Sequence, residues 1–393
     1  MTLFGRAAVA AMALLVAVQV VRNAAVRALA DTRPANAAAL WSGHPQAELG
    51  VAMTAIGSAA HLGQPVGREV FDKIDDAAKK APLAAEPFLV RGVQAQLAGE
   101  TTLARRAFEA AQWRDPRSLP ARYFLADHYL RAGDVKRGLT EFAALARLAP
   151  NGIVNVTPYV ATYARNPARW PQLKALFRSD PDLAETTLEA LAHDGANTTA
   201  ILALANRPHR NARSPWLPVL LATLVSEGQY QQARAIWAGV AGVRESPGQL
   251  LFDTHFADAS APPPFNWTLA SSTIGLAERQ GGGQLHVIYY GQEEGALASQ
   301  LLTLAPGHYA LGMRVSGGGA RRAALRWTLT CADAQMPFAT ISLDALARGS
   351  QTFDVPANCS AQRLELVGSS SDIPQQVDAT IGQMSLTRAN ANG

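Results

Sequence analysis

The segment Glu86–Asn151 reads EPFLVRGVQAQLAGETTLARRAFEAAQWRDPRSLPARYFLADHYLRAGDVKRGLTEFAALARLAPN and carries one pattern twice. Pro82, Pro116 and Pro150 are spaced by 34 residues each. A fixed period of this length indicates stacked two-helix units, in which each unit buries its apolar side against the next one. The sequence therefore predicts a helical repeat architecture in the middle of the chain.

Residue types at the repeated positions agree with a pair of helices joined by a tight turn. Gly99 and Gly133 follow apolar-periodic stretches, where a residue with positive φ ends a first helix. Phe108 recurs in phase as Phe142 and fills the gap between helices. The proline after each second helix stops that helix, because proline lacks an N–H donor and restricts the residue before it.

These positions resemble the tetratricopeptide repeat (TPR) family over about Glu86–Asn151. The third unit departs from the family at Leu145, where the family prefers alanine. The resemblance implies helical hairpins with a concave face that binds peptides or proteins. The framework positions that it assigns are Ala77, Pro82, Gly92, Gly99, Ala104, Phe108, Ala111, Pro116, Tyr129, Gly133, Gly138, Phe142, Leu145 and Pro150.

The repeat becomes irregular on both sides of its clear part. Residues 51–84 form a degenerate preceding unit, and a late pair of stretches, Leu217–Ser226 and Gln231–Val240, is repeat-like again around Gly228. We predict one α-solenoid over residues 37–242. A coiled coil is disfavoured because no heptad runs through the turns. The alternative that the array only spaces an anchor from a terminal domain stays open.

The N-terminus, residues 1–33, is a membrane anchor or a signal segment. An apolar run from Leu3 to Val21 reaches the lower length limit for a membrane-spanning helix if Arg6 snorkels. The alternatives are a signal peptide cleaved after Ala30 and a buried globular helix. Arginines after the run favour a cytoplasmic body by the positive-inside rule, whereas the cleavage-like site favours export. We expect a single-pass protein of the bacterial inner membrane with a periplasmic body.

The sequence pattern changes after about Gly242, from helical periodicity to short alternating runs. We assign residues 243–264 to a linker and a first strand, and residues 265–390 to an antiparallel β-sandwich of the jelly-roll type, because short alternating runs stand between turn residues. The segment from Leu302 to Tyr309 is predicted to be a strand, a tight turn and a return strand. The layout loosely resembles carbohydrate-binding modules. The expected fold is thus multidomain, α and then β.

Two cysteines, Cys331 and Cys359, lie in this last part of the chain. They form either a disulfide or a pair of buried thiols, and the disulfide is preferred if the body is exported. Tyr289 and Tyr290 are the candidates for stacking on a sugar ring, since adjacent strand residues face opposite sides and one of them must leave the core.

The net charge of +4 is unevenly shared, with +7 up to Leu250 and −3 from Leu251 onward, which fits separate modules. No dense Lys/Arg run predicts nucleic-acid binding. The sequence contains neither a His-Glu-x-x-His motif nor a Gly-x-Ser-x-Gly elbow, and no Cys-x-x-Cys or His/Cys cluster predicts a metal site. We predict no catalytic residue and no cofactor.

We therefore expect a non-enzymatic scaffold of the bacterial envelope that binds protein partners through the solenoid and the membrane through its first helix. A link to surface polysaccharide assembly or export is inferred by analogy. One alternative is a carbohydrate-binding or carbohydrate-active protein whose sandwich holds the ligand. Another is a pure protein adaptor whose sandwich is also a docking surface.

Overall fold

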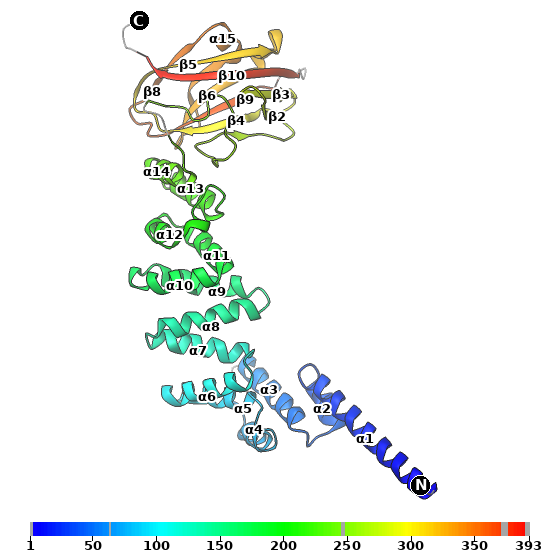
Figure 1. The fold of residues 1–393 in the computed structure, drawn as a ribbon. Coiled ribbons are helices and arrows are strands. Elements are labelled where there is room, and N and C mark those ends of the chain that lie inside the picture. Colours follow the sequence, from blue (N-terminus) through cyan, green and yellow to red (C-terminus); the bar gives the residue numbers. More distant parts are fainter. Residues whose placement is uncertain (1–2, 63, 245–247, 371–375, 390–393) are drawn as a thin grey trace. The chain divides into compact units, whose positions relative to one another are not determined.

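The computed structural model describes residues 3–62, 64–244, 248–370 and 376–389. Helices occupy the first part of the chain and two antiparallel sheets the last part, as Figure 1 shows. The chain divides into two compact units, Met1–Val156 and Thr157–Gly393. The predicted fold class, helical hairpins followed by an antiparallel β-sandwich, is confirmed.

The first unit consists of helices that pack largely in consecutive pairs, with α3 against α4, α5 against α6 and α7 against α8. Its elements are α1 (Leu3–Ala30), α2 (Pro34–Leu40), α3 (Pro45–Leu62), α4 (Arg68–Lys80), α5 (Glu86–Leu97), α6 (Thr101–Arg114), α7 (Leu119–Arg131), α8 (Val135–Leu148) and the start of α9 (Gly152–Ala164).

The turns between paired helices have a clear local cause. Gly99 and Gly133 have φ of +78° and +81°, directly after α5 and α7, and no atom lies within 4 Å of a Cβ added at either position. The left-handed backbone, and not a shortage of space, therefore favours glycine there. Ser118 and Asp134 cap α7 and α8, since their side-chain oxygens accept hydrogen bonds from the N–H groups of Ala121 and Arg137.

Close approach of a small residue and a large one holds the hairpins together. A Cβ on Gly92 of α5 would lie 2.4 Å from the Phe108 ring of α6. Phe108 is fully buried, and its ring stacks on that of Phe124 of α7, with centroids 4.7 Å apart and planes 4° apart. In the next hairpin, a Cβ on Gly138 would lie 2.4 Å from the Leu130 side chain. The absence of a side chain at these glycines lets a neighbouring large one enter.

The second unit begins with further helices and ends with the sandwich. The pair α13 and α14 is joined at Gly228, whose φ is +74°. The helical elements are η1 (Pro167–Arg169), α10 (Trp170–Ser179), α11 (Pro181–Ala192), η2 (Gly195–Asn197), α12 (Thr198–Leu204), η3 (Arg207–His209), α13 (Trp216–Ser226) and α14 (Tyr230–Ala241).

The sandwich has two five-stranded sheets, with strand orders β1-β4-β9-β6-β7 and β2-β3-β10-β5-β8, and all pairs are antiparallel. From β3 to β10, strands that follow one another in the chain mostly alternate between the sheets, as in a jelly roll. The elements are β1 (Thr268–Leu269), β2 (Gly275–Gln280), β3 (Gln284–Tyr289), β4 (Gly295–Leu302), β5 (Gly307–Gly317), η4 (Gly319–Ala324), β6 (Leu325–Cys331), β7 (Pro337–Ser342), α15 (Leu343–Arg348), β8 (Gln351–Val355), β9 (Gln362–Gly368) and β10 (Val377–Arg388).

Two details of the predicted sandwich were wrong. The turn between Leu302 and Tyr309 does not close a hairpin, because β4 pairs with β1 and β9 while β5 pairs with β8 and β10. The chain crosses there from one sheet to the other. The segment 243–264 holds no strand among its described residues, and β1 begins at Thr268. Three successive prolines, Pro262–Pro264, offer no N–H donors to a sheet there.

The core of the sandwich lies between the facing sheets and is built from inward residues of alternating strands. Along β3, Leu285, Val287 and Tyr289 are fully buried, whereas the residues between them are less buried. Trp327 of β6 is also fully buried and contacts Trp267, with ring centroids 5.8 Å apart. The placement of Trp327 agrees with a core residue in a strand of period two.

The contact between Gly92 and Phe108 predicts an unusual cost for adding a single methyl group. Gly92→Ala forces the buried Phe108 ring to move and should lower the free energy of unfolding by about 1–3 kcal/mol. Gly57→Ala is the matched control, because Gly57 lies in α3 with nothing within 4 Å of an added Cβ. Because alanine has a greater helix propensity than glycine, Gly57→Ala should leave the free energy of unfolding unchanged or raise it by up to about 1 kcal/mol. Urea unfolding followed by circular dichroism measures both, and equal stability of the two variants would contradict the close approach.

Candidate functional site

A groove of ≈ 330 Å³ lies on the first unit between the first helices of neighbouring hairpins. Its lining residues come from α7, from the C-terminal end of α8 and from the start of α9. Its lining is apolar apart from the amide of Asn155 and the hydroxyl of Tyr123. The lining residues are Leu119, Pro120, Tyr123, Phe124, Leu145, Ala149, Gly152, Asn155 and Val156.

Aromatic packing holds the α7 side of this groove in place. Phe124 stands between the Phe108 ring, on which it stacks, and Tyr123, whose ring meets it edge to face at a centroid distance of 6.0 Å. Tyr123 is nevertheless 46% exposed. A large ring that is half exposed and held by a partly buried neighbour loses little conformational entropy on binding, so it suits an anchor contact.

The α9 side approaches α8 so closely that only glycine fits. A Cβ on Gly152 would lie 2.4 Å from the carbonyl oxygen of Leu145 and 2.6 Å from that of Ala146. Asn151, which precedes it, has φ of 54°, so the chain turns sharply between Pro150 and α9. This turn places the first residues of α9 with Leu145 and Ala149 in the lining of the groove.

Polar contacts between α6 and α7 connect one hairpin with the next. The hydroxyl of Tyr129 on α7 donates to Glu109 Oε1 on α6 at 2.9 Å, and Arg105 donates to the same carboxylate at 2.8 Å. Burial and the hydrogen bond to Glu109 raise the pKa of Tyr129 to about 12. Tyr129 therefore stays a neutral donor at physiological pH.

A second carboxylate, Glu141 on α8, joins three helices. Its Oε2 accepts a hydrogen bond from Gln112 of α6 and another from Arg122 of α7, each at 2.7 Å. Arg122 also donates to the carbonyl oxygen of Pro116, in the turn before α7. The side chains of Arg122 and Glu141 are only 17% and 12% exposed, so this ion pair is largely shielded from solvent.

The predicted framework residues and the groove are almost separate sets. Of the framework positions only Leu145 lines the groove. Most of the others pack between helices, as Ala77, Ala104, Phe108 and Ala111 do with at most 2% exposure. The sequence reasoning missed Tyr123 and Phe124, although two adjacent aromatics in a first helix, one of which must face outward, were the available signal.

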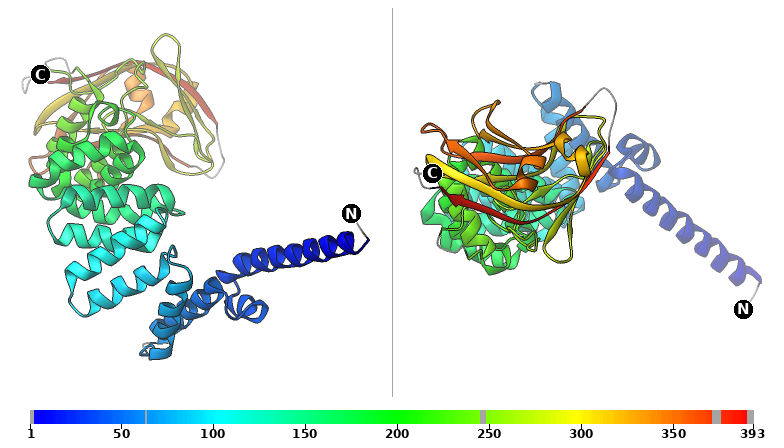
Figure 2. Two further views of the ribbon diagram at one scale, coloured as in Figure 1. Left: turned by 60° about the horizontal axis from the view of Figure 1, so that its bottom comes forward. Right: turned by 90° about the horizontal axis from the view of Figure 1, so that it is seen from above.

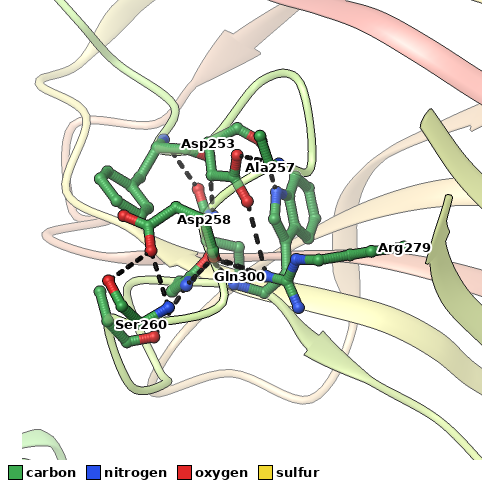
Figure 3. A network of polar contacts seen from close by, with 10 residues as sticks. Asp253, Ala257, Asp258, Ser260, Arg279 and Gln300 are labelled. Carbon is green, nitrogen blue, oxygen red and sulfur yellow. Dashed lines mark hydrogen bonds and ion pairs between the residues drawn. The ribbon is translucent and has the colours of Figure 1, made fainter. Parts of the chain in front are cut away.

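In the second unit, a loop of residues 251–267 joins the last helices to the sandwich and is held by buried polar side chains (Figure 3). Asn266, which is 1% exposed, donates to the carbonyl oxygens of Asp258 and Ala261, both at 2.8 Å. Gln300 of β4 forms two hydrogen bonds with the backbone of Phe252, each at 3.1 Å. These contacts replace the ladder that a strand would supply.

The guanidinium of Arg279 on β2 gathers oxygen atoms of the same loop, as Figure 3 shows. Its Nη2 donates to the Asp258 carbonyl at 3.1 Å and to Asn266 Oδ1 at 3.3 Å, and lies 3.5 Å from Asp253 Oδ2. The hydrogen bond from the Ser260 hydroxyl lowers the pKa of Asp258, which keeps its carboxylate ionised as an acceptor. Residues 251–264 of the predicted linker therefore form an ordered element.

This loop presents a socket for Trp237 of α14. The fully buried indole donates from Nε1 to the carbonyl oxygen of Pro262 at 2.7 Å. Its ring meets Phe252 edge to face at 5.0 Å and lies 5.6 Å from the Phe265 ring. One side chain thus joins the final helical pair to the sandwich.

A wider groove, of ≈ 890 Å³, lies next to this joint. Its helical side includes Pro218, Val225 and Tyr230, and its other side includes Pro263, Pro264 and residues beside both cysteines. Glu227 at its rim accepts a hydrogen bond from the Gly195 backbone N–H at 3.2 Å. The carboxylate therefore also braces the end of α13 against η2.

The structure also places the remaining residues singled out in the sequence. Cys331 and Cys359 form a disulfide. Tyr289 points into the sandwich core, and its hydroxyl donates to the carbonyl oxygen of Glu293 at 3.1 Å. Tyr290 is 40% exposed. The two tyrosines therefore do not form one platform, because adjacent strand residues face opposite sides.

Within the described ranges, no group of three or more His, Cys, Asp or Glu residues could hold a metal ion. The nearest arrangement is His286 on β3, with Asp378 Oδ1 2.9 Å from Nε2 and Glu278 Oε1 3.3 Å from Nδ1. The two carboxylates contact different nitrogens of the His286 ring. This arrangement suits a pair of hydrogen bonds across three strands.

The socket predicts different costs for two substitutions of Trp237. Trp237→Ala empties the socket and should cost about 3–5 kcal/mol of stability. Trp237→Phe keeps most of the ring packing but loses the hydrogen bond to Pro262, so the cost should be nearer to about 1 kcal/mol. Trp113→Ala is the control, because Trp113 is 72% exposed. Differential scanning calorimetry measures the loss of stability of each variant. Equal losses for Trp237→Ala and Trp113→Ala would contradict the socket.

No protein-family model matches the chain, and no curated protein matches it. Among solved structures, it is similar to a chain of the accessory secretory proteins 1, 2 and 3 of Streptococcus pneumoniae, with 7% identity and a TM-score of 0.26, over 37% of this chain and 99% of that one. It is also similar to YrrB, described as a TPR protein with an unusual peptide-binding site, with 13% identity and a TM-score of 0.24, over 44% of this chain and 92% of that one.

Proposed function

We propose that this chain is a non-enzymatic scaffold of the bacterial envelope that is anchored in the inner membrane and holds a protein partner in the groove between α7 and α9. The observation that carries the proposal is the groove itself, an apolar hollow of ≈ 330 Å³ with the half-exposed Tyr123 at its side. This volume is near the lower end for ligand sites, about 300 Å³, so it suits one or two anchoring side chains of a protein segment.

The kind of partner follows from the lining. Leu119, Phe124 and Val156 offer apolar surface, whereas Asn155 offers an amide that can both donate and accept hydrogen bonds. We infer an extended segment with a large apolar residue, whose side chain enters the groove and whose backbone pairs with Asn155. Such an anchor would supply most of the binding energy.

Two features support the envelope location. Helix α1 is long and apolar enough to cross a membrane, with a candidate span Val9–Ala30, by length and composition alone. The disulfide between Cys331 and Cys359 agrees with an oxidising compartment, so we place the body in the periplasm.

The link to surface polysaccharide rests on architecture, because carbohydrate-binding modules also use jelly-roll sandwiches. Tyr290 is the exposed ring that favours the alternative, a sugar-binding sandwich. A single ring offers less stacking surface than a platform of several, so we place this alternative second.

Photo-crosslinking from the groove tests the proposal. A photoreactive amino acid replaces Tyr123 in the full chain, and Leu103 of α6, which is 55% exposed, serves as the matched position on a second helix. A discrete protein adduct is expected from position 123 and none from position 103. Adding Ala149→Arg covers the groove with a long charged side chain and should reduce that adduct roughly tenfold or more. Equal adducts at both positions, or an adduct that Ala149→Arg leaves unchanged, would contradict the proposal.

The disulfide gives an independent test of the compartment. Protein denatured in the presence of a thiol-blocking reagent should show no labelled cysteine, whereas Cys331→Ser should show one, at Cys359. The same variant should lower the stability of the sandwich by about 3–4 kcal/mol, as expected for a closed loop of this length. Two labelled thiols in the unmodified chain would remove the support for a periplasmic body.

A further inference from the structure

Helix α1 has two parts with different surroundings. Every residue from Val9 to Val21 is exposed, including large apolar ones such as Met12, Leu14 and Val20, which are 62–67% exposed. Figure 2 shows this part of α1 extending away from the other helices of its unit. After Val21 the helix becomes partly covered, and Val26 is completely buried.

Packing of other helices against α1 begins at Arg22. Its Nε and Nη2 donate to the carbonyl oxygen of Leu40, at 3.0 and 2.9 Å, at the C-terminal end of α2. Its guanidinium also lies over the Trp41 ring, 4.5 Å from the centroid. A last-turn carbonyl of α2 thus receives the partner that it lacks within its own helix. Contacts with α2 and Trp41 therefore hold the Arg22 side chain against the folded part of its unit.

One turn further along, Val26 belongs to a small protein core. It packs with Ala37 of α2 and Ala47 of α3, both 0% exposed, and with the partly buried Leu29 and Trp41. Because this face of α1 is closed by protein, residues after Arg22 can enter hydrocarbon only if α2 enters with them.

The residues between α1 and α2 make entry of α2 into the hydrocarbon unfavourable. Asp31, Arg33 and Asn36 are exposed, and they lie in or next to the turn between the helices. Charged groups and turn backbone are costly in hydrocarbon, where no water satisfies them. The segment from Arg22 onward therefore belongs outside the hydrocarbon layer.

We propose that the hydrocarbon of the bilayer ends at Val21, and that α2 with Trp41, here called the exit collar, rests in the phospholipid headgroup layer. This inference rests on the membrane anchoring proposed above. The span then runs from Leu3 to Val21, a length of about 28 Å at 1.5 Å per residue, close to the thickness of the hydrocarbon layer.

The chemistry of the exit collar fits that layer. Tryptophan favours the membrane–water interface, where its ring is half in apolar surroundings. Leu40 beside it is apolar and 46% exposed, and the exposed cations Arg27 and Arg33 lie where lipid phosphates would be. Composition alone allows a later end at Ala30, so the two boundaries differ by nine residues or about 13 Å.

Cysteine accessibility in phospholipid vesicles of phosphatidylcholine and phosphatidylglycerol distinguishes the boundaries. The full chain carries single substitutions Ala17→Cys, Ala24→Cys or Ala28→Cys, and the native cysteines are already paired. All three positions are exposed in the protein, so differences in labelling by a membrane-impermeant maleimide report the lipid. Asn36→Cys, on the exit collar, provides the reference rate and cancels any mixture of orientations.

The proposal predicts that positions 24 and 28 react within about threefold of position 36, and that position 17 reacts at least roughly tenfold more slowly, because a thiolate does not form in hydrocarbon. Protection of positions 24 and 28 equal to that of position 17 would overturn the exit at Val21 and leave the anchor intact. Equal labelling at all positions, with release of the protein by alkaline wash, would overturn the anchor itself.

Discussion

The helical part of this protein depends on the fit of a large side chain against a position with none. Phe108 occupies the space left by Gly92, and its ring then meets Phe124 of the following hairpin. The contact is therefore part of both a hairpin and the junction to the next one. A stack of helices has no single centre, so its order depends on such contacts being passed from each unit to its neighbour.

That dependence connects packing with the candidate site. Phe124 lines the groove on one side and meets the buried Phe108 ring on the other, so the position of the groove wall is fixed by the interior. In the same hairpins, Glu109 and Glu141 each bind side chains from neighbouring helices. Partly shielded carboxylates with several donors fix the relative rotation of helices better than apolar contacts do, because hydrogen bonds are directional.

Both junctions of the chain use tryptophan and a carbonyl oxygen. At the joint of the second unit, the Trp237 indole donates to Pro262 and fills an aromatic socket. At the end of α2, Trp41 accepts the Arg22 guanidinium over its ring, while the same guanidinium binds Leu40. In each case a large flat side chain contributes apolar area. One hydrogen bond orients the Trp237 ring, whereas two hydrogen bonds from Arg22 to Leu40 hold the cation over the Trp41 ring. The junctions are therefore ordered without any regular secondary structure running through them.

The sequence by itself determined the helical hairpins and the strands. Glycines at positive φ and prolines at a spacing of 34 residues act locally, so a period is enough to place them, and period-two runs such as Leu285–Tyr290 placed the strands for the same reason. Only the tertiary structure decided which surfaces these elements leave open. The crossing of the chain between Leu302 and Tyr309, the ordered loop before β1 and the groove beside Tyr123 all depend on partners distant in sequence. No sequence period predicts those partners, because each of these contacts occurs only once. The stabilisation that each contact gives comes from burial in the folded protein.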